Sequence, residues 1–430
     1  MLLAVVLGTC VGVMAAPPRV VQTTPENDAV DVDPATSEIV VVFDQPMDPA
    51  GRSIVGGGET FPEIIDAPQW RDERTIVIPV RLQADHDYWL SINNENFRNF
   101  ANRRGESAEP YPLSFSTSPP PGTAPIDPEV NRRAVAQLRE AIENNYSYRD
   151  LRQVKWDELF AEHREKLEQA ATAKAFGRDA AAMLSTAGDM HILVRAGTRT
   201  FATHRPNAAM NFNLASVSRL VPEFTWHGGV AIGKLPGGIT YILIPSWGDA
   251  QRASLDHVYA AIAEADASKG IIIDVRPNGG GDELLARQVA GCFIDTPRVY
   301  SKNTIREGGQ WRGPFDRVVE PNAKQPPFRG KVVVLQGQQC MSSNESFLLM
   351  MKSAGATLVG ERSYGSSGRP MPFELANGVT VLLPSWRDMR PDGTLLEGEG
   401  VAPDVEVKFP PAVFERNDPV LMAGMKALRG

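Results

Sequence analysis

A proline-rich stretch, "SPPPGTAPIDP" at residues 118–128, limits most strongly how this 430-residue chain can fold. Proline fits poorly in the interior of a helix or in the middle of a sheet, and the stretch has no periodic apolar positions. Such a composition predicts a semi-rigid linker. We therefore expect two parts with separate hydrophobic cores, one on each side of it.

Residues 17–117 show the pattern of short, half-buried strands separated by Pro, Asn, Asp and Gly. In "SEIVVVFDQPMDP", Ile39, Val41 and Phe43 fall on one face of a strand with a period of two residues. This pattern predicts a small all-β sandwich. The stretch "TTPENDAVDVDPATSEIVVVFDQPMDP" resembles bacterial Ig-like modules of surface and secreted proteins. The resemblance implies a spacer, or a module that contacts the cell surface or another protein.

After the linker the apolar period becomes helical, and residues 129–190 are expected to form a helical subdomain. Farther on, continuous apolar strands such as "GIIIDVRP" and "GKVVVLQG" alternate with helices such as "SNESFLLMMKSAG". Buried strands separated by helices indicate a mainly parallel α/β layer. Residues 191–415 are therefore expected to form an α/β core.

The first residues, "MLLAVVLGTCVGVMAAPP", form an apolar run shorter than the about 20 residues that span a bilayer. The run ends in small residues before a proline pair, which predicts a signal peptide over residues 1–16. The mature protein would be periplasmic or extracellular, with no transmembrane span. Cys10 in "LGTC" offers an alternative in which the exported protein carries a lipid anchor.

The composition argues against some partners and cofactors. With 52 acidic residues against 44 Lys and Arg, a net charge of −8 and no long basic run, nucleic acid is not an expected partner. Cys292 and Cys340 lie in apolar contexts, so a single disulfide between them is the most that is expected. No His and Cys spacing suited to zinc is present in the sequence, and we expect no metal or other cofactor.

A serine at the start of a predicted helix has two interpretations. The quartet Ser342, Ser343, Asn344 and Glu345 fits the S-x-x-E capping box, in which the serine side chain caps the helix. Ser342 also follows the strand "KVVVLQGQQ", at a turn where a nucleophile would have its oxyanion stabilised by the helix start. From these residues alone, the capping interpretation is favoured.

A second turn, "RPNGGGD" at residues 276–282, follows the predicted strand "GIIID". Glycines let consecutive N–H groups point into one concavity, where they can hold an oxyanion or a phosphate. The alternative is a tight connection between a strand and a helix. The spacing fits neither a dinucleotide fingerprint nor a Walker loop.

A serine nucleophile needs a base, and one of the six histidines lies at a suggestive position. His191, in "LSTAGDMHILV", lies where a predicted helix gives way to a strand. Asp189, two residues earlier, could orient an imidazole or simply cap the chain end. The sequence does not place His191 next to Ser342.

Four ordered motifs, "LSTAGDMHILV", "GIIIDVRPNGGG", "SSNESFLLMMKSAGATLVGERSYGSSG" and "LEGEGVAPDVEV", resemble those of one serine peptidase family. That family includes C-terminal processing proteases, which are tail-specific, the tricorn protease core and the repeats of interphotoreceptor retinoid-binding protein. The resemblance covers roughly residues 127–408 and implies a ClpP/crotonase-like α/β core. Its S-A-S-E motif corresponds to Ser342–Glu345, which places Ser342 as the nucleophile.

One departure from the family pattern indicates the subtype. The Ser-Lys branch has a lysine where this chain has Ser366, in "YGSSG". Lys352 cannot replace it, because ten helical residues of about 1.5 Å each place it roughly 15 Å along the helix from Ser342. The tricorn-like branch uses histidine instead, and His191 matches the D-x-H position of that branch.

The resemblance also implies that a glutamate is linked to the histidine through a relay of hydrogen bonds. Glu397 in "EGEGVAPD" matches the glutamate of the tricorn-like branch, but Met190 replaces the serine that carries the relay. Asp189 is therefore an alternative orienting group. No segment between Leu193 and Gly238 is long enough for the inserted PDZ domain of many relatives.

Together these features predict an exported serine peptidase that hydrolyses peptide or protein substrates through Ser342, His191 and Glu397. The predicted oxyanion hole consists of N–H groups of Gly280, Gly279 and Ser343. The main alternative is a non-catalytic protein that binds apolar ligands or peptides, because a fold does not fix a function. A further alternative makes Cys340 the nucleophile.

Overall fold

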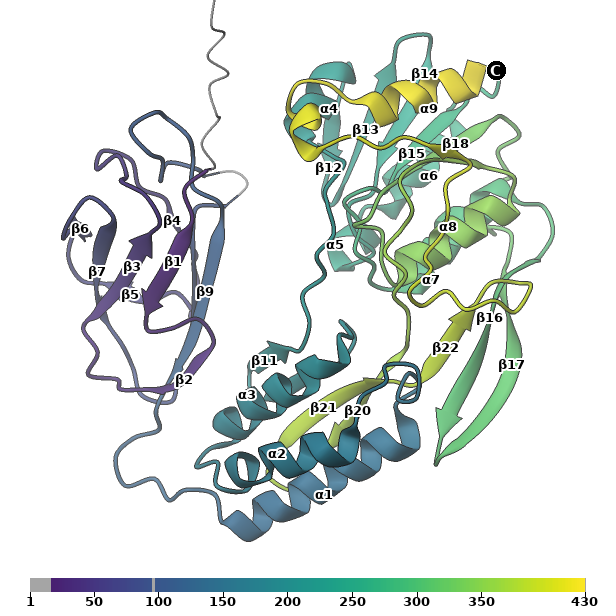
Figure 1. The fold of residues 1–430 in the computed structure, drawn as a ribbon. Coiled ribbons are helices and arrows are strands. Elements are labelled where there is room, and N and C mark those ends of the chain that lie inside the picture. The colour runs from purple at the N-terminus through teal and green to yellow at the C-terminus, as the bar shows by residue number, and fades with distance from the viewer. Residues whose placement is uncertain (1–16, 95–96, 430) are drawn as a thin grey trace, which may run out of the picture.

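The computed structural model describes residues 17–94 and 97–429. The predicted signal peptide, residues 1–16, and Cys10 lie outside the described residues. Figure 1 shows a β sandwich at the left, three helices at the bottom and an α/β layer at the upper right. In the described ranges no helix has the length and apolar character needed to cross a membrane.

The N-terminal part is the predicted all-β sandwich of two sheets. Its strands are β1 (Val20–Thr24), β2 (Ala29–Val32), β3 (Glu38–Phe43), β4 (Ile54–Val55), β5 (Glu63–Ile64), β6 (Gln69–Trp70), β7 (Thr75–Arg81), β8 (Asp87–Ile92) and β9 (Tyr111–Thr117). One sheet has the order β1-β3-β7-β5, with β6 paired to β7, and the other has the order β2-β9-β8-β4. Ile39, Val41 and Phe43 are buried between them, as the period of two predicts.

Residues 118–127 form neither helix nor strand, and three helices follow: α1 (Pro128–Asn145), α2 (Trp156–Glu168) and α3 (Ala173–Leu184). Helix α1 begins where the Asp127 side chain accepts a hydrogen bond from the N–H of Glu129, with Pro128 at the first helical position. The helices share a core with a four-stranded antiparallel sheet of order β11-β10-β21-β20. Its strands are β10 (Leu193–Ala196), β11 (Arg199–Ala202), β20 (Pro370–Glu374) and β21 (Val379–Pro384).

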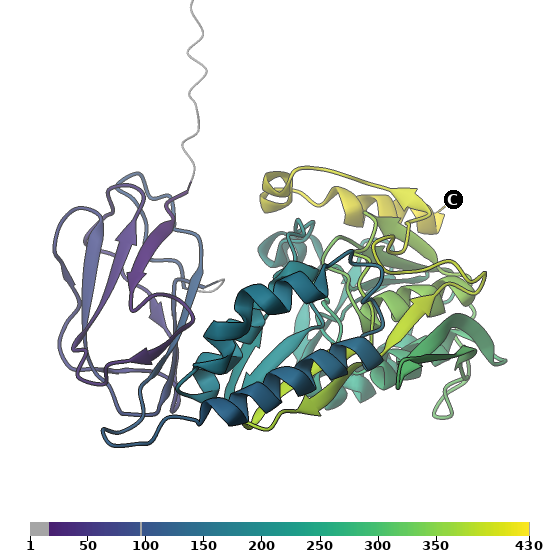
Figure 2. The same ribbon diagram turned by 60° about the horizontal axis from the view of Figure 1, so that its bottom comes forward.

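This unit is larger than the helical subdomain that we predicted for residues 129–190. Strands from two distant segments, 193–202 and 370–384, complete it, and Figure 2 shows the helices lying over them. The second segment comes from within the predicted α/β core. The chain therefore leaves the helical unit, builds the α/β layer and returns to the helical unit.

The α/β layer contains a seven-stranded sheet of order β12-β13-β14-β15-β18-β19-β23. Its strands are β12 (Thr225–His227), β13 (Val230–Leu235), β14 (Ile239–Leu243), β15 (Ile271–Asp274), β18 (Val332–Gln336), β19 (Thr357–Gly360) and β23 (Val405–Glu406). The pairs from β14 to β23 are parallel, which confirms the predicted mainly parallel α/β layer.

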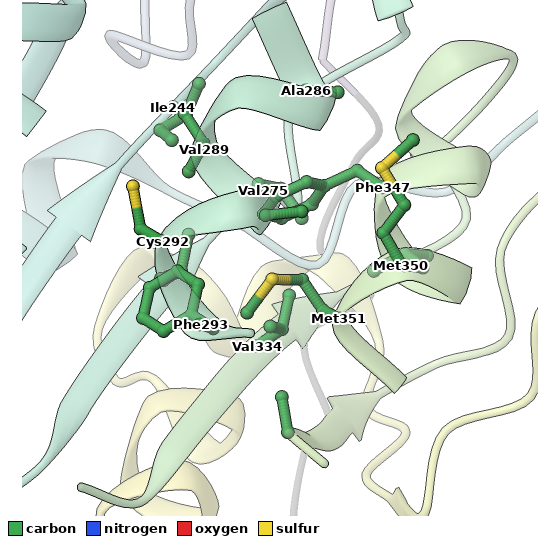
Figure 3. Close-up of a cluster of buried hydrophobic side chains, with 14 of the residues drawn as sticks. Ile244, Val275, Ala286, Val289, Cys292, Phe293, Val334, Phe347, Met350 and Met351 are labelled. Carbon is green, nitrogen blue, oxygen red and sulfur yellow. The ribbon is translucent and has the colours of Figure 1, made fainter. Parts of the chain in front are cut away.

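Helices cover both faces of this sheet. They are α4 (Leu214–Leu220), α5 (Asp249–Arg252), α6 (Leu255–Ala263), α7 (Glu283–Ala290), α8 (Ser343–Ser353) and α9 (Pro419–Arg429). Figure 3 shows one core, in which Phe347, Met350 and Met351 of α8 lie close to Val275 and Val334 at the sheet. This packing fixes the start of α8 at the sheet edge. A three-stranded sheet of order β17-β16-β22 adjoins it, with β16 (Arg298–Glu307), β17 (Gln310–Val319) and β22 (Trp386–Met389).

The linker does not hold the sandwich away from the rest of the chain. Arg199 of β11 is only 7% exposed, and its guanidinium lies 2.9 Å from both the carboxylate of Asp28 and the hydroxyl of Ser114 in the sandwich. Lys174 of α3 forms ion pairs of 3.1 Å with Asp85 and Asp87. The sandwich is thus docked on the helical unit by these polar contacts, which the composition of the linker did not indicate.

Replacing Asp28 by asparagine is expected to lower the free energy of unfolding by about 1–3 kcal/mol, because the largely buried Arg199 then loses its carboxylate. Denaturant unfolding of the full chain measures the loss. Asp66→Asn is a matched control, since the Asp66 carboxylate lies on an exposed loop of the sandwich and accepts only from the N–H of Ala67. An equal effect of the two substitutions would show that the ion pair does not contribute to docking.

Candidate active site

The site lies where two adjacent strands end. Strands β15 and β18 are parallel neighbours, so the glycine turn after β15 and the Ser342 turn after β18 meet at one edge of the sheet. A Cβ atom on Gly280 would lie 2.9 Å from the Cβ of Ser342, and the φ of Gly280 is 109°. Only glycine allows this close approach of the two turns.

Ser342 has a strained backbone and does not cap helix α8. Its φ is 54° and its ψ is −131°, a conformation that costs a residue with a side chain roughly 1–3 kcal/mol. Its side chain makes no capping hydrogen bond. The predicted capping box is therefore wrong, because the turn points the hydroxyl away from the helix.

Glu345, the other member of the predicted box, supports the neighbouring loop instead. Its buried carboxylate accepts hydrogen bonds from the Ser363 hydroxyl at 2.5 Å and from the N–H groups of Gly365 at 2.8 Å and Ser366 at 2.7 Å. The carbonyl of Ser366 in turn accepts from the N–H of Ser342 at 3.0 Å. Burial raises the pKa of Glu345 to about 7. Glu345 thus holds the loop that fixes the Ser342 backbone.

His191 lies beside Ser342, although 151 residues separate them in the chain. The Nε2 atom of His191 is 3.0 Å from the Ser342 hydroxyl. The His191 side chain is 10% exposed, and its burial lowers the pKa of His191, an effect that the nearby Asp189 carboxylate opposes. The imidazole is therefore neutral at neutral pH and can accept a proton from the serine.

Asp189 is the carboxylate nearest to the other nitrogen of that histidine. The Nδ1 atom of His191 is buried without a hydrogen-bond partner in the described part of the chain, and Asp189 lies 3.9 Å from it. The Asp189 carboxylate accepts from the His191 N–H at 2.9 Å and from the Tyr146 hydroxyl at 2.8 Å. Asp189 thus both shapes the turn and places a negative charge next to the imidazole.

Glu397 reaches this cluster through an arginine. Its carboxylate accepts from the Ser367 N–H at 2.7 Å and pairs with Arg152, which lies 3.6 Å from Asp189. No hydrogen bond joins Glu397 to His191 within residues 17–94 and 97–429. Burial raises the pKa of Glu397 to about 8, with Asp189 adding to the shift and Arg152 opposing it.

Arg152 and Tyr146 belong to this site, although the sequence did not indicate either of them as a site residue. Tyr146 is one of several apolar positions of a helical stripe, and Arg152 lies in the connection between α1 and α2 with no motif around it. Both approach Asp189 only because helices α1 and α2 share a hydrophobic core with α3 and β10. No signal in the sequence distinguishes them from other residues of that unit.

The N–H groups of the predicted oxyanion hole differ in whether they already donate a hydrogen bond within the protein. The N–H of Gly280 donates to the Asn278 side chain at 2.9 Å, so this donor is already engaged. The N–H groups of Gly279 and Ser343 form no hydrogen bond with any described residue. The Ser343 hydroxyl donates to the Gly281 carbonyl at 2.9 Å and joins the two turns.

The structure argues against the other candidate groups. Cys340 is fully buried, its thiol donates to the Val275 carbonyl at 3.2 Å, and burial raises its pKa, so it cannot act as the nucleophile. Cys292 and Cys340 are both free, and the single disulfide is not formed. Lys352 pairs with Asp404 at 2.8 Å. Groups of three or more potential metal ligands are absent from the residues that the structure describes.

A pocket of about 530 Å³ opens beside Ser342. Its lining comes from the start of α7, the start of α8, the segment before β20 and strand β22. The lining residues are Gly281, Asp282, Glu283, Leu284, Arg287, Arg317, Ser342, Ser343, Ser346, Ser367, Gly368, Arg369, Pro370, Trp386 and Asp388.

A strained serine at a strand-to-helix turn, in contact with a neutral histidine, is an arrangement typical of serine hydrolases. Comparison with known families specifies the class: residues 238–407 match Peptidase family S41, and residues 15–117 match the bacterial Ig-like domain. The chain therefore contains a Peptidase family S41 domain preceded by a bacterial Ig-like domain. The family match includes Ser342 and Glu397 but not His191.

Curated relatives match less than half of the chain. The tricorn protease of Thermoplasma acidophilum is 27% identical over 187 residues, which are 41% of this chain and 15% of that protein. The carboxy-terminal-processing protease of Bartonella bacilliformis is 25% identical over 166 residues, 38% of this chain and 37% of that protein. The match thus spans well under half the length of these relatives.

Solved structures show the same fold at low sequence identity. A protein from Parabacteroides merdae ATCC 43184 has a TM-score of 0.59 at 20% identity, covering 71% of this chain and 98% of that one. Mature CPAF has a TM-score of 0.52 at 11% identity, covering 70% of this chain and 97% of that one. At these identities the likeness supports the fold alone.

Proposed function

We propose that the protein is a serine peptidase that hydrolyses peptide bonds with Ser342 as nucleophile and His191 as general base. The observation that carries the proposal is the 3.0 Å contact between the Ser342 hydroxyl and the Nε2 atom of His191. The strained backbone of Ser342 supports it, because such strain is typical of functional sites and serves no capping role here.

In the proposed reaction, the Ser342 hydroxyl attacks the scissile carbonyl while the Nε2 atom of His191 takes its proton. His191 then protonates the leaving amine, and a water molecule hydrolyses the acyl-enzyme through the same base. The N–H groups of Ser343 and Gly279 are available to the oxyanion, and that of Gly280 becomes available when Asn278 releases it.

Two carboxylates would stabilise the positive charge of the imidazolium that forms, one directly and one indirectly. Asp189 lies nearest to the Nδ1 atom of His191, at 3.9 Å, close enough for its negative charge to stabilise the imidazolium. Glu397 acts from farther away, through its ion pair with Arg152. We therefore assign Asp189 the orienting role and Glu397 the role of fixing Arg152.

Labelling with a fluorophosphonate, followed by mass mapping of the modified residue, tests the proposed nucleophile. An adduct on Ser342 is expected, because only an activated serine reacts with this class of probe. The matched control is Ser343→Ala, which removes the adjacent hydroxyl and should leave the adduct in place. Absence of any adduct on the folded protein would contradict the proposal.

A non-catalytic binding protein is the second candidate, and one observation favours it. The Nδ1 atom of His191 has no hydrogen-bond partner among the described residues, so the base is not fully oriented in this state. A folded protein that binds peptides with unchanged affinity after Ser342→Ala, and that neither cleaves them nor reacts with the fluorophosphonate, would support this candidate.

The pH dependence of kcat/KM should reflect the burial of His191. Burial lowers the pKa of its imidazole, and the neutral form is the active base. Activity therefore rises as the pH increases through a value below about 6.5, the ordinary pKa of histidine. Initial rates at low substrate concentration between pH 4 and 8 measure this acidic limb. A limb well above the ordinary histidine value would indicate another base.

We also propose that the protein is exported, to the periplasm or beyond, on the basis of the apolar leader "MLLAVVLGTCVGVMAA". N-terminal sequencing of protein from its native host should find Ala16 or Pro17 as the first residue. A cytoplasmic protein that retains Met1 would contradict export. The Ig-like domain would then be available for contact with a surface or a protein partner.

A further inference from the structure

The pocket beside Ser342 combines an apolar wall with charged groups. Leu284, Pro370 and Trp386 supply apolar surface at its rim. The Trp386 ring is held in place by the guanidinium of Arg317, which lies 4.6 Å from the ring centroid. A substrate side chain that enters from Ser342 can therefore pack its hydrocarbon part against a fixed surface.

The charges at the inner end of the pocket neutralise one another. Arg317 is 5% exposed and pairs with Glu283 and, at 2.6 Å, with Asp388. Arg287 also pairs with Glu283, at 2.7 Å. Two arginines and two carboxylates thus form a closed network. It leaves no net charge for a ligand and keeps the inner wall rigid.

Two further charged residues line the pocket, and only one of them has an ion-pair partner within the described portion of the chain. Asp282 pairs with Arg252, which lies outside the lining, at 2.5 Å. Arg369 is exposed, and its side chain forms no ion pair or hydrogen bond with any residue in the ranges 17–94 and 97–429. The pocket therefore presents one uncompensated positive charge.

The main chain of Arg369 is nevertheless fixed. Its carbonyl accepts from the N–H of Ser385 at 3.0 Å and from the Ser385 hydroxyl at 2.8 Å, which ties it to the end of β21. It is also two residues after Ser367, whose N–H is bound by Glu397 of the active-site network. The free guanidinium is thus carried by a segment with a defined position relative to Ser342.

We infer that this pocket binds a carboxylate of the substrate and that Arg369 is the residue that recognises it. A guanidinium is suited to this role, because its planar N–H groups match the two oxygens of a carboxylate. The inference deepens the proposed peptidase function and rests on it. The carboxylate has two sources, an acidic side chain near the cleaved bond or the C-terminal carboxylate of the peptide.

Four sets of peptides distinguish these sources. Glu and Gln are compared at each position flanking the cleaved bond, and each peptide is made with a free and with an amidated C-terminus. The wild-type enzyme should prefer one carboxylate form by about three- to tenfold in kcat/KM, the range for an ion pair that is partly open to water. A preference for Glu identifies a side chain, and a preference for the free end identifies the C-terminus.

Arg369→Gln should abolish that preference by lowering kcat/KM for the carboxylate form of the peptide, and Arg369→Lys should retain part of it. Arg416→Gln is the matched control, because Arg416 is an exposed arginine outside the pocket lining whose side chain forms no ion pair or hydrogen bond with a described residue. Equal cleavage of all four peptide sets by the wild type, or an unchanged preference in Arg369→Gln, would overturn the inference.

A binding measurement separates failure of this inference from failure of the proposed function. The dissociation constants of the same peptides are measured with the full-length Ser342→Ala protein, which cannot cleave them. A carboxylate preference that is lost with the additional Arg369→Gln substitution supports the inference even if the wild type proves inactive. Equal affinity for all peptides contradicts it, whether or not the wild type cleaves them.

Discussion

Replacing His191 by alanine is expected to lower kcat/KM by about 100- to 10,000-fold, the usual contribution of a general base. The Nε2 atom of His191 is the only nitrogen base within hydrogen-bond distance of the Ser342 hydroxyl among the described residues. After its removal, only substrate binding and the oxyanion donors contribute to the rate. Steady-state kinetics on a short peptide, with circular dichroism to verify folding, measure the effect.

Further variants test whether the loss of activity is due to removal of the general base. Ser342→Ala should be at least as inactive as His191→Ala, and the double variant should be little worse than either, because the two residues act as one unit. Asp189→Asn should cost more than Glu397→Gln, since Asp189 is the carboxylate next to the imidazole. Near-normal turnover of His191→Ala alongside an inactive Ser342→Ala would require another base, with Asp189 or a second histidine as the next candidate.

Replacing Arg276 by methionine is expected to lower the free energy of unfolding by about 3–5 kcal/mol. Arg276 is fully buried between Asp274, at 2.6 Å, and Asp418, at 2.8 Å. Removing it leaves two buried carboxylates without a counter-charge. It also detaches the end of β15 from the start of α9, because Asp418 accepts from the N–H of Leu421. Denaturant unfolding monitored by fluorescence measures the loss.

The glycine turn of the candidate active site follows Arg276, so activity should fall together with stability. Arg416→Met is the control, because surface substitutions usually change stability by less than about 0.5 kcal/mol. A triple variant that also replaces Asp274 and Asp418 by asparagine should recover part of the loss, since no buried charge remains unpaired. A loss below about 1 kcal/mol in Arg276→Met would show that water or structural relaxation compensates the carboxylates.

Parts of the site could be predicted from local sequence. The strand ending in "GIIID" and the one in "GKVVVLQG" are continuous apolar runs, and both prove to be buried neighbours in the parallel sheet. The turns after them are marked by glycines and by the serine quartet, so their position at one sheet edge follows from the topology of parallel sheets. The role of Ser342 could not be predicted from these residues alone, because the same quartet, Ser342–Glu345, fits both a capping box and a turn that carries a nucleophile.

The sequence by itself determined the sandwich with its buried Ile39, Val41 and Phe43, and the parallel α/β layer. Each of these depends on the spacing of apolar residues within one segment, and this spacing can be read directly from the local sequence. Only the tertiary structure brought His191 to Ser342, placed Arg152 and Tyr146 around Asp189 and docked Asp28 on Arg199. Those contacts join segments tens to hundreds of residues apart, and they depend on how separate layers pack rather than on any local pattern.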